Sequence, residues 1–388
     1  MVAKIFKRVV ISLIATGFLG YWGISAVLSG VTVSGTGGGH STQNSITRAI
    51  DAHQTEKANR DKMEQLQANL EFICKHEEKP ELSQETQQLY NYALYHDLHN
   101  MWTGKKGDAI WNGLARYYRI AAANDDYKAN LRLQYLLKSG RISSDMPQTE
   151  VHNLNEALAK QLPATAYYNL YGYLDVGYGV RTEKDGKYAY LRKAADLGSR
   201  EAQYVVGDIL TDIDDEETRP LRLKIYEQLL SCASEQGLGI ASRFLGINYE
   251  GKKEYSKALK AFYQGVKNGD SQSAGWLVTA FSDKNSNNTE FSELPTDVER
   301  ARRYKIIEDY LYEKDYLQPK VPDLDEIVPL PPAPLPDWDG KIAFQRWFEG
   351  EAPPKPSEAL MFKLANQAGV RVDNGLDLQT DLPKAVKK

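Results

Sequence analysis

Three short stretches decide the fold: Tyr168-Asn-Leu-Tyr-Gly172, Gln203-Tyr-Val-Val-Gly207 and Arg243-Phe-Leu-Gly246. They lie between Ala164 and Leu277, and their glycines are 35 and 39 residues apart. A second helical stretch follows each of them and ends in a glycine: Gly198, Gly237 or Gly269. Pairs of helices that recur at this spacing are typical of a helical solenoid. One such pair cannot bury its apolar face alone, so several must stack.

Small residues recur where these helices are expected to meet. We interpret them as packing positions without a chemical role: Gly172, Gly207, Gly246, Ala194, Ala195, Ala202, Ala241 and Ala258. The glycines that end the second helices are predicted to form left-handed C-caps, because glycine adopts positive φ without strain: Gly198, Gly237 and Gly269.

The best copy of the repeat resembles a known family. Gly177-Tyr-Gly179-Val180 followed by Lys193-Ala194-Ala195-x-x-Gly198 is similar to the Sel-like repeats, which are relatives of the tetratricopeptide repeats. The resemblance is strong over residues 164–207 and weaker as far as Gly269. It implies an all-α, right-handed solenoid of helix pairs that binds other proteins. The later copies lack the Gly-x-Gly-Val loop.

Weaker copies extend the predicted repeats over residues 83–281. Degenerate outer copies are expected, because terminal repeats must face solvent. A polar helix is predicted before them over residues 46–82. Met63, Leu66, Leu70 and Ile73 form a narrow apolar stripe on it, and Lys79-Pro80 breaks it.

The first 33 residues resemble a membrane anchor. Lys4, Lys7 and Arg8 precede an uncharged run over residues 9–33, which is long enough to cross a bilayer. The positive flank predicts a single pass through a bacterial inner membrane, with the N-terminus in the cytoplasm and the bulk of the chain in the periplasm. A cleaved signal peptide remains an alternative. Residues 34–45, rich in glycine and serine, are predicted to be a tether.

Residues 282–388 form the predicted C-terminal domain. Its stretch over residues 321–340 is rich in proline and is therefore expected to be extended. Apolar residues interleave with the prolines, so we expect this stretch to lie along the solenoid as a strap. Leu324-Asp-x-Ile-Val-Pro and Trp338-Asp-Gly340 resemble a proline- and tryptophan-containing C-terminal domain of unknown function from Gram-negative bacteria.

Charge and cysteine content narrow the function. The net charge of −4 and the lack of a basic patch argue against nucleic-acid binding. Cys74 and Cys232 are the two cysteines, and they could pair in an oxidising compartment. Because Cys232 lies among apolar residues of a predicted helix, the sequence favours a buried free thiol.

We find no signature of an enzyme, so no catalytic, cofactor-binding or metal-binding residue is predicted. There is no Gly-x-Ser-x-Gly elbow. His96 and His99 share one helical face, and Cys74 and His76 are neighbours, but we interpret the histidines as surface residues. The acidic stretch over residues 212–217 lacks the pattern of a calcium-binding loop and predicts a solvated turn.

What remains is a binding surface. Tyrosine and arginine are common at protein interfaces, because they contribute large contact areas and directed hydrogen bonds. The predicted partner-binding residues lie on several repeats and on the proline-rich stretch: Tyr168, Tyr171, Tyr173, Tyr204, Arg243, Tyr249 and Trp338.

These features favour a membrane-anchored scaffold that binds a protein in the periplasm. The hypothesis is an immunity-type protein that blocks a secreted antibacterial toxin, such as a phospholipase effector of a type VI secretion system. The alternative is a structural adaptor that organises envelope or cell-wall protein complexes.

Overall fold

The computed structural model describes residues 71–101, 109–282 and 295–384. The predicted anchor (1–33), the predicted tether (34–45) and the first part of the predicted helix over 46–82 lie outside these residues. Within the described ranges, no helix is both long enough and apolar enough to cross a membrane. The chain divides into two compact units: a larger one of residues 74–207 and 227–388, and a smaller one that includes residues 208–226.

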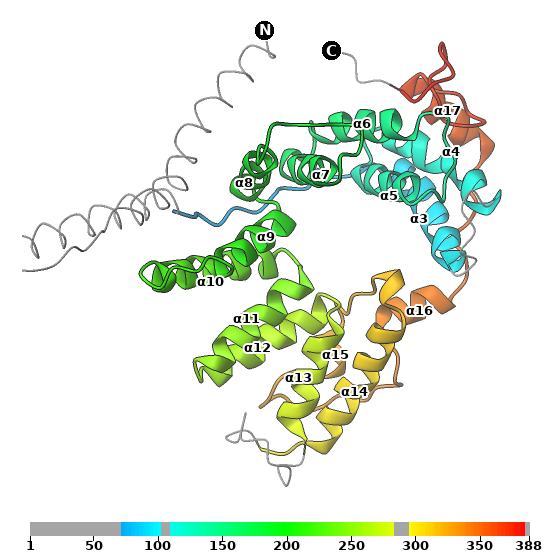
Figure 1. Cartoon of the computed structure of the whole chain (residues 1–388). Helices are drawn as coiled ribbons and strands as arrows, with labels where there is room; N and C mark the ends of the chain where they lie inside the picture. The colour runs from blue at the N-terminus through cyan, green and yellow to red at the C-terminus, as the bar shows by residue number, and fades with distance from the viewer. Residues whose placement is uncertain (1–70, 102–108, 283–294, 385–388) are drawn as a thin grey trace, which may run out of the picture. The chain divides into compact units, whose positions relative to one another are not determined.

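The larger unit begins with six helices that each pack against the next one in the chain (Figure 1). They are α3 (Gln84–His99), α4 (Ala109–Ala123), α5 (Tyr127–Lys138), α6 (Pro147–Leu158), α7 (Pro163–Val176) and α8 (Lys187–Leu197). A buried ion pair lies among the apolar residues of this part. The carboxylate of Asp97 is fully buried and accepts hydrogen bonds from Arg132 Nε at 2.6 Å and from Tyr118 Oη at 2.7 Å. Because an unpaired buried charge is costly, these side chains stabilise the fold only together.

Six further helices follow: α9 (Arg200–Thr211), α10 (Arg219–Glu235), α11 (Gly239–Gly251), α12 (Tyr255–Lys267), α13 (Ser271–Phe281) and α14 (Val298–Glu313). From α11 to α14 each helix again packs against its successor. Phe262 of α12 stacks on Trp276 of α13, and Phe281 stacks on Tyr304 of α14. The described residues are thus all-α and contain helices packed in chain order, as predicted. The right-handed sense of the solenoid stays a prediction.

The glycines confirm most of the predicted repeat positions. Gly198, Gly237 and Gly269 have φ values of 108°, 89° and 88°, as left-handed C-caps require. At Gly246, an added Cβ would lie 2.5 Å from the ring of Phe262, so α11 and α12 do approach closely there. The predicted alanines at the interfaces are buried.

The packing role predicted for Gly172 is wrong. An added Cβ at this position would meet no atom within 4 Å. Ala166, Ala202 and Ala241 are buried at equivalent places in α7, α9 and α11. Counting five residues from each alanine leads to Tyr171, Gly207 and Gly246. Aligning the three helices by their glycines alone therefore places α7 one residue out of register with α9 and α11.

The predicted helix over residues 46–82 is also wrong for its described part. Residues 71–83 contain no helix and run as an extended trace (blue in Figure 1). Residues 74–83, here called the N-terminal segment, lie in the larger unit. Their backbone is held by side chains of α9 and α10, described below, instead of by a helical ladder. Pro80 also lacks the N–H that a helix interior needs.

The proline-rich segment (residues 321–340) lies along α14, as predicted for the strap. Arg303 of α14 donates from one nitrogen to the carbonyls of Ile327 and Pro336, both at 2.7 Å. Tyr304 donates its hydroxyl to the carbonyl of Val328 at 3.1 Å. Apolar residues of the segment are buried in one cluster with residues of α12 to α14: Val321, Val328, and Leu324 and Ile327 of the short helix α15 (Leu324–Ile327).

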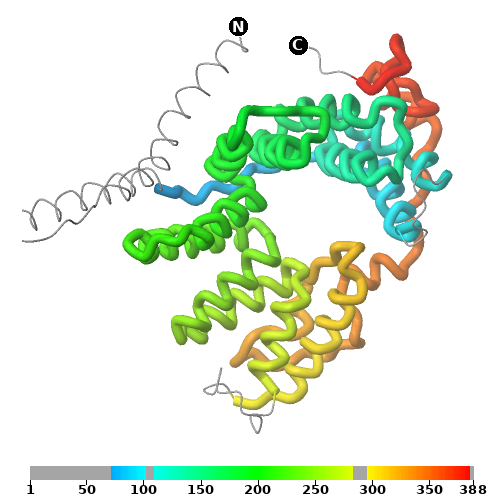
Figure 2. Tube along the Cα trace, in the orientation of Figure 1, coloured from blue at the N-terminus to red at the C-terminus, as the bar shows by residue number. Residues whose placement is uncertain are grey.

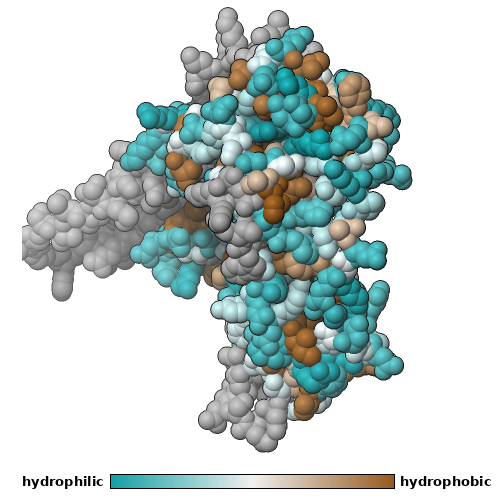
Figure 3. All heavy atoms as spheres, turned by 90° about the vertical axis from the view of Figure 1, so that its right-hand side faces the viewer, coloured by the Kyte–Doolittle hydropathy of each residue, from teal (hydrophilic) through white to brown (hydrophobic). Residues whose placement is uncertain are grey.

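After this segment the chain returns to the first helices (Figure 2). It forms α16 (Ala343–Glu349) and α17 (Glu358–Ala368), and α17 packs against α4. Glu358 of α17 pairs with Arg116 of α4 at 2.9 Å, and Tyr95 of α3 donates to the carbonyl of Gly350 at 2.8 Å. On the face seen in Figure 3, apolar groups are small and separated by polar ones.

The smaller unit contains the acidic turn. The guanidinium of Arg222, which is buried, donates to the carbonyl of Asp215 at 2.7 Å and to that of Leu210. Residues 211–214 are exposed, so the prediction of a solvated turn is confirmed. One buried arginine holds the backbone of this turn.

Candidate functional site

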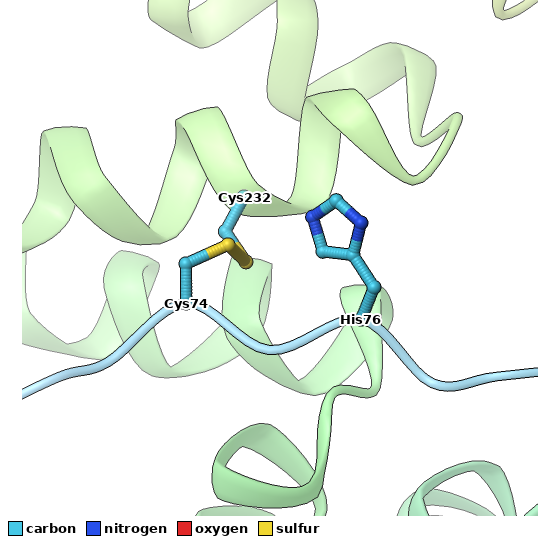
Figure 4. A group of neighbouring side chains, drawn as sticks. All are labelled: Cys74, His76 and Cys232. Carbon is cyan, nitrogen blue, oxygen red and sulfur yellow. A yellow bond between two sulfur atoms is a disulfide. The ribbon is translucent and has the colours of Figure 1, made fainter.

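A disulfide joins Cys74 of the N-terminal segment to Cys232 of α10 (Figure 4). The predicted free thiol at Cys232 is therefore wrong, although Cys232 is buried as expected. The sequence could not reveal the pairing, because 158 positions separate the two cysteines. The fold brings their Cα atoms to 5.6 Å, which is within the usual range for a disulfide.

Two glutamines hold the N-terminal segment next to this disulfide. Gln203 of α9 donates from Nε2 to the carbonyl of Lys75 at 2.9 Å. Gln236, just after α10, donates to the oxygen of Gln203 at 2.9 Å and accepts from the backbone N–H of Glu77 at 3.3 Å. These contacts reach the backbone of the segment and not its side chains, so they are independent of its sequence.

Glu77 connects the N-terminal segment to the start of α7. Its carboxylate accepts from the backbone N–H of Ala164 at 2.6 Å and of Thr165 at 3.1 Å. Helix N-termini have unpaired N–H groups and attract negative charge. The segment also touches the end of α8, where a Cβ at Gly198 would lie 2.7 Å from the nitrogen of Glu77. The left-handed glycine thus caps α8 and gives the segment room to pass.

The predicted binding tyrosines fall into two groups. Tyr168 and Tyr171 of α7 are half-buried, and their rings lie 6.0 Å apart. Tyr188 of α8 extends this group at 6.4 Å from Tyr171 and is exposed. Burial, followed by the charge of Glu201, raises the pKa of Tyr168, so its hydroxyl stays protonated. These rings can contact a partner.

Tyr173 cannot contact a partner, so its predicted role is wrong. Only 2% of the residue is exposed, and its hydroxyl donates to the amide oxygen of Gln134 in α5. Burial raises the pKa of this tyrosine. Because residues two apart on a helix do not share a face, Tyr171 and Tyr173 point to different surroundings.

A second group lies on α9 and α11. Tyr204 stacks against Phe244, with ring centroids 6.1 Å apart. The guanidinium of Arg243 lies 5.3 Å from the centre of the Phe244 ring and pairs with Asp270 at 3.3 Å. All of these side chains are half-buried. The sequence prediction included Tyr204 and Arg243 but missed Phe244, because Arg243 and not Phe244 occupies the repeat position of Tyr204.

Tyr249 and Trp338 lie apart from these groups. Burial, followed by the nearby charge of Glu227, raises the pKa of Tyr249 to about 12. Trp338 donates from its indole nitrogen to the carbonyl of Lys341 at 2.7 Å. Trp338 lines a cavity of about 370 Å³, together with Asp323, Glu326, Ile327, Asp337, Asp339 and Arg346. The structure therefore distributes the predicted residues over several surfaces.

The histidines that the sequence singled out are surface residues. His99 is exposed and stacks on Phe348 of α16 with ring centroids 4.0 Å apart. Burial, followed by the charge of His99, lowers the pKa of His96.

In the described part of the chain, the three residues Cys74, His76 and Cys232 bring their sulfur and nitrogen atoms within 4.8 Å of one another.

A family model matches the C-terminal part of this chain. Residues 273–384 match the model of a family described as a Domain of unknown function (DUF6396). No curated protein matches the sequence.

Several solved structures are similar to this chain. The immunity protein Pa5087 from Pseudomonas aeruginosa is 23% identical, with a TM-score of 0.46 over 68% of this chain and 96% of that one. The immunity protein PA5088 from the same organism is 21% identical, with a TM-score of 0.49 over 68% and 95%. A Sel1 repeat protein from Oxalobacter formigenes is 18% identical, with a TM-score of 0.35 over 67% and 96%.

Proposed function

We propose that this protein is a scaffold of the immunity type, which binds a secreted antibacterial toxin and blocks it sterically. The proposed toxin is an enzyme such as a phospholipase effector of a type VI secretion system. The protein would be held in the bacterial inner membrane by residues 9–33, with the folded units in the periplasm. We infer no catalytic activity and no cofactor for the protein itself.

The observation that carries this proposal is the row of half-exposed rings on helices of successive pairs. Tyr168 on α7 and Tyr204 on α9 each lie two residues after a buried alanine, and Phe244 on α11 stacks against Tyr204. Stacked helix pairs present such positions on one extended surface. Aromatic rings contribute large contact areas at low entropy cost, which suits a surface that binds another protein.

The disulfide supports the proposed compartment. Disulfides persist in oxidising environments such as the periplasm and are rare in the cytosol. The resemblance of residues 164–207 to Sel-like repeats supports a protein partner.

The test is a protection assay in bacteria that express a periplasm-directed toxin encoded beside this gene. The full chain should restore growth, and the double variant Tyr204→Ala/Phe244→Ala should lose that protection. Tyr312→Ala is the matched control, because Tyr312 on α14 is 75% exposed and lies outside the row of rings.

Identifying the proteins that copurify with the full chain from envelope extracts distinguishes the toxin hypothesis from the adaptor alternative. A toxin bound in equal amounts, whose activity falls on binding, supports the proposal. The structural adaptor would replace the immunity proposal if the full chain gives no protection and its partners are a set of resident cell-wall proteins.

A further inference from the structure

Two regular spacings bring three potential metal ligands together at the disulfide and place a fourth group, the carboxylate of Glu235, beside one of them, His76. In an extended chain, residues two apart point to the same side, so Cys74 and His76 both face α10. On a helix, residues three apart share a face, so Cys232 and Glu235 lie together on α10. Figure 4 shows Cys74 and His76 on the N-terminal segment beside Cys232 on the helix.

The distances bear out this convergence. The two sulfur atoms and one ring nitrogen of His76 lie within 4.8 Å of one another. Nε2 of His76 lies 3.4 Å from Oε2 of Glu235. Zinc binds sulfur, imidazole nitrogen and carboxylate oxygen, and a tetrahedral site has four such ligands.

We propose that Cys74, His76, Cys232 and Glu235 bind one zinc ion when the disulfide is reduced. A dithiol supplies the two electrons and two protons that convert the disulfide into two thiols, and the dithiol itself becomes a disulfide. Zinc binding then releases both thiol protons to solvent, because the thiolate is the form that coordinates metal. The oxidised protein lacks these thiolates and does not bind zinc through them.

Zinc binding requires only a small movement of the ligand atoms, and most of it falls on the extended N-terminal segment. Bond lengths of about 2.3 Å to sulfur and about 2.0 Å to nitrogen place tetrahedral ligand atoms roughly 3.5 Å apart. The two sulfur atoms must separate, and the imidazole must come to about this distance from them. The carboxylate of Glu235, which contacts His76 and is largely exposed, must turn toward the metal. Cys74 and His76 are exposed and belong to an extended segment, while Cys232 is buried in α10. The segment can therefore adjust around a fixed helical half of the site.

Zinc would keep the N-terminal segment on α10 after reduction. The disulfide and the metal site use the same two sulfur atoms, so they exclude each other. Either one attaches the segment to α10, beside the contacts of Gln203 and Gln236 with its backbone.

The test is a titration of the full chain, in detergent, with Co²⁺ as a spectroscopic probe. The reduced protein should take up one Co²⁺ and show thiolate-to-cobalt charge-transfer absorption with the visible bands of a tetrahedral site. Zinc should abolish both signals. The oxidised protein should show neither. Circular dichroism of the reduced protein checks that its helices remain.

Variants identify the four ligands. His76→Ala and Glu235→Gln should each weaken binding to the reduced protein at least about tenfold, because even groups that only support a ligand cost about 10–100-fold when removed. Cys74→Ser should abolish the charge-transfer band of a two-thiolate site. Glu227→Gln, two turns earlier on α10, is the matched control and should leave the affinity unchanged.

Several results would overturn the proposal. One is a reduced, helical protein that gives no charge-transfer band. Another is a band that is the same in His76→Ala and Glu235→Gln as in the natural sequence, because the metal would then bind an ordinary pair of thiols. Loss of the helices on reduction in the presence of zinc also counts against it, since the site needs α10 and the N-terminal segment side by side.

Discussion

The N-terminal segment and the proline-rich segment both lie across helices of the larger unit, but different forces hold them. The N-terminal segment is mostly exposed and is attached by one disulfide and by hydrogen bonds to its backbone. The proline-rich segment buries Val321, Leu324 and Val328 completely, and side chains of α14 donate to its carbonyls.

This difference shows that an extended segment can be fixed by burial or by a crosslink. A segment that buries apolar side chains gains stability from removing them from water, so it is part of the core. A polar segment gains little from burial. Its disulfide instead acts mainly by restricting the unfolded chain. We therefore expect the two attachments to respond to different perturbations.

The largest effect is expected at Tyr304, which anchors the proline-rich segment. Tyr304→Ala removes a fully buried ring and should lower the free energy of unfolding by about 3–5 kcal/mol. Tyr304→Phe keeps the ring and loses only the hydrogen bond to Val328, so it should cost about 1 kcal/mol. Chemical denaturation measures both. Equal losses would mean that the hydrogen bond, and not burial, holds this segment.

Loss of the disulfide should have the next largest effect. The double variant Cys74→Ser/Cys232→Ser should lose about 2–4 kcal/mol of unfolding free energy. The proline-rich segment should stay protected, while proteases cut within residues 74–83. Limited proteolysis followed by mass spectrometry checks this difference. Cleavage first in residues 321–340 would contradict the separate attachment of the two segments.

A pair of glycines tests the contact between the N-terminal segment and α8. Both Gly198 and Gly177 end a helix with positive φ, but an added Cβ meets atoms of the segment only at Gly198. Gly177→Ala should cost about 1–2 kcal/mol from the left-handed backbone alone. Gly198→Ala should cost about 1–3 kcal/mol more, because the segment's backbone must move aside. Thermal unfolding of the two variants measures the difference, and equal costs would show that the segment moves freely.

A pH-dependent effect is expected at Lys320, which directly precedes the proline-rich segment and lies near Lys79 of the N-terminal segment. Desolvation, followed by the charges of Arg200 and Lys79, lowers the pKa of Lys320 to about 8. Between that pH and the ordinary lysine value of 10.5, the unfolded chain binds more protons, so stability should rise with pH through this range. Lys320→Gln should flatten this rise.

Lys79 belongs to the N-terminal segment, so its removal should raise the pKa of Lys320. An NMR titration of the Lys320 side chain in Lys79→Ala measures this shift. Lys128→Ala is the control, because Lys128 affects the pKa of Lys79 and is not among the charges that act on Lys320. An unchanged pKa in Lys79→Ala would contradict the electrostatic link between the N-terminal segment and Lys320.

The two segments also differ in how far they could be predicted. In residues 321–340, prolines exclude a regular helix, and interleaved Ile327, Val328 and Leu330 indicate a buried side. Residues 74–83 have no apolar pattern, and the polar helix predicted there rested on spacing further upstream. Their conformation depends on Gln203, Gln236 and Cys232, which are more than 120 positions away.

The candidate binding residues show the same limit. Residue type alone indicates that a tyrosine can contact a partner. Tyr171 and Tyr173 show the limit of this rule, because both are tyrosines but only Tyr173 is buried. The core cluster around Tyr173 makes this tyrosine internal, and there its hydroxyl donates to Gln134 in α5. Phe244 was missed because its value comes from Tyr204 on another helix.

By itself the sequence determined the helix pairs, their glycine caps and the apolar side of the proline-rich segment. These features are local, since spacing and backbone preference act within a few residues. Only the tertiary structure decided the one-residue shift of Gly172, the extended path of residues 74–83 and the pairing of Cys74 with Cys232. Those depend on contacts between residues far apart in the chain, which become neighbours only when the helices stack.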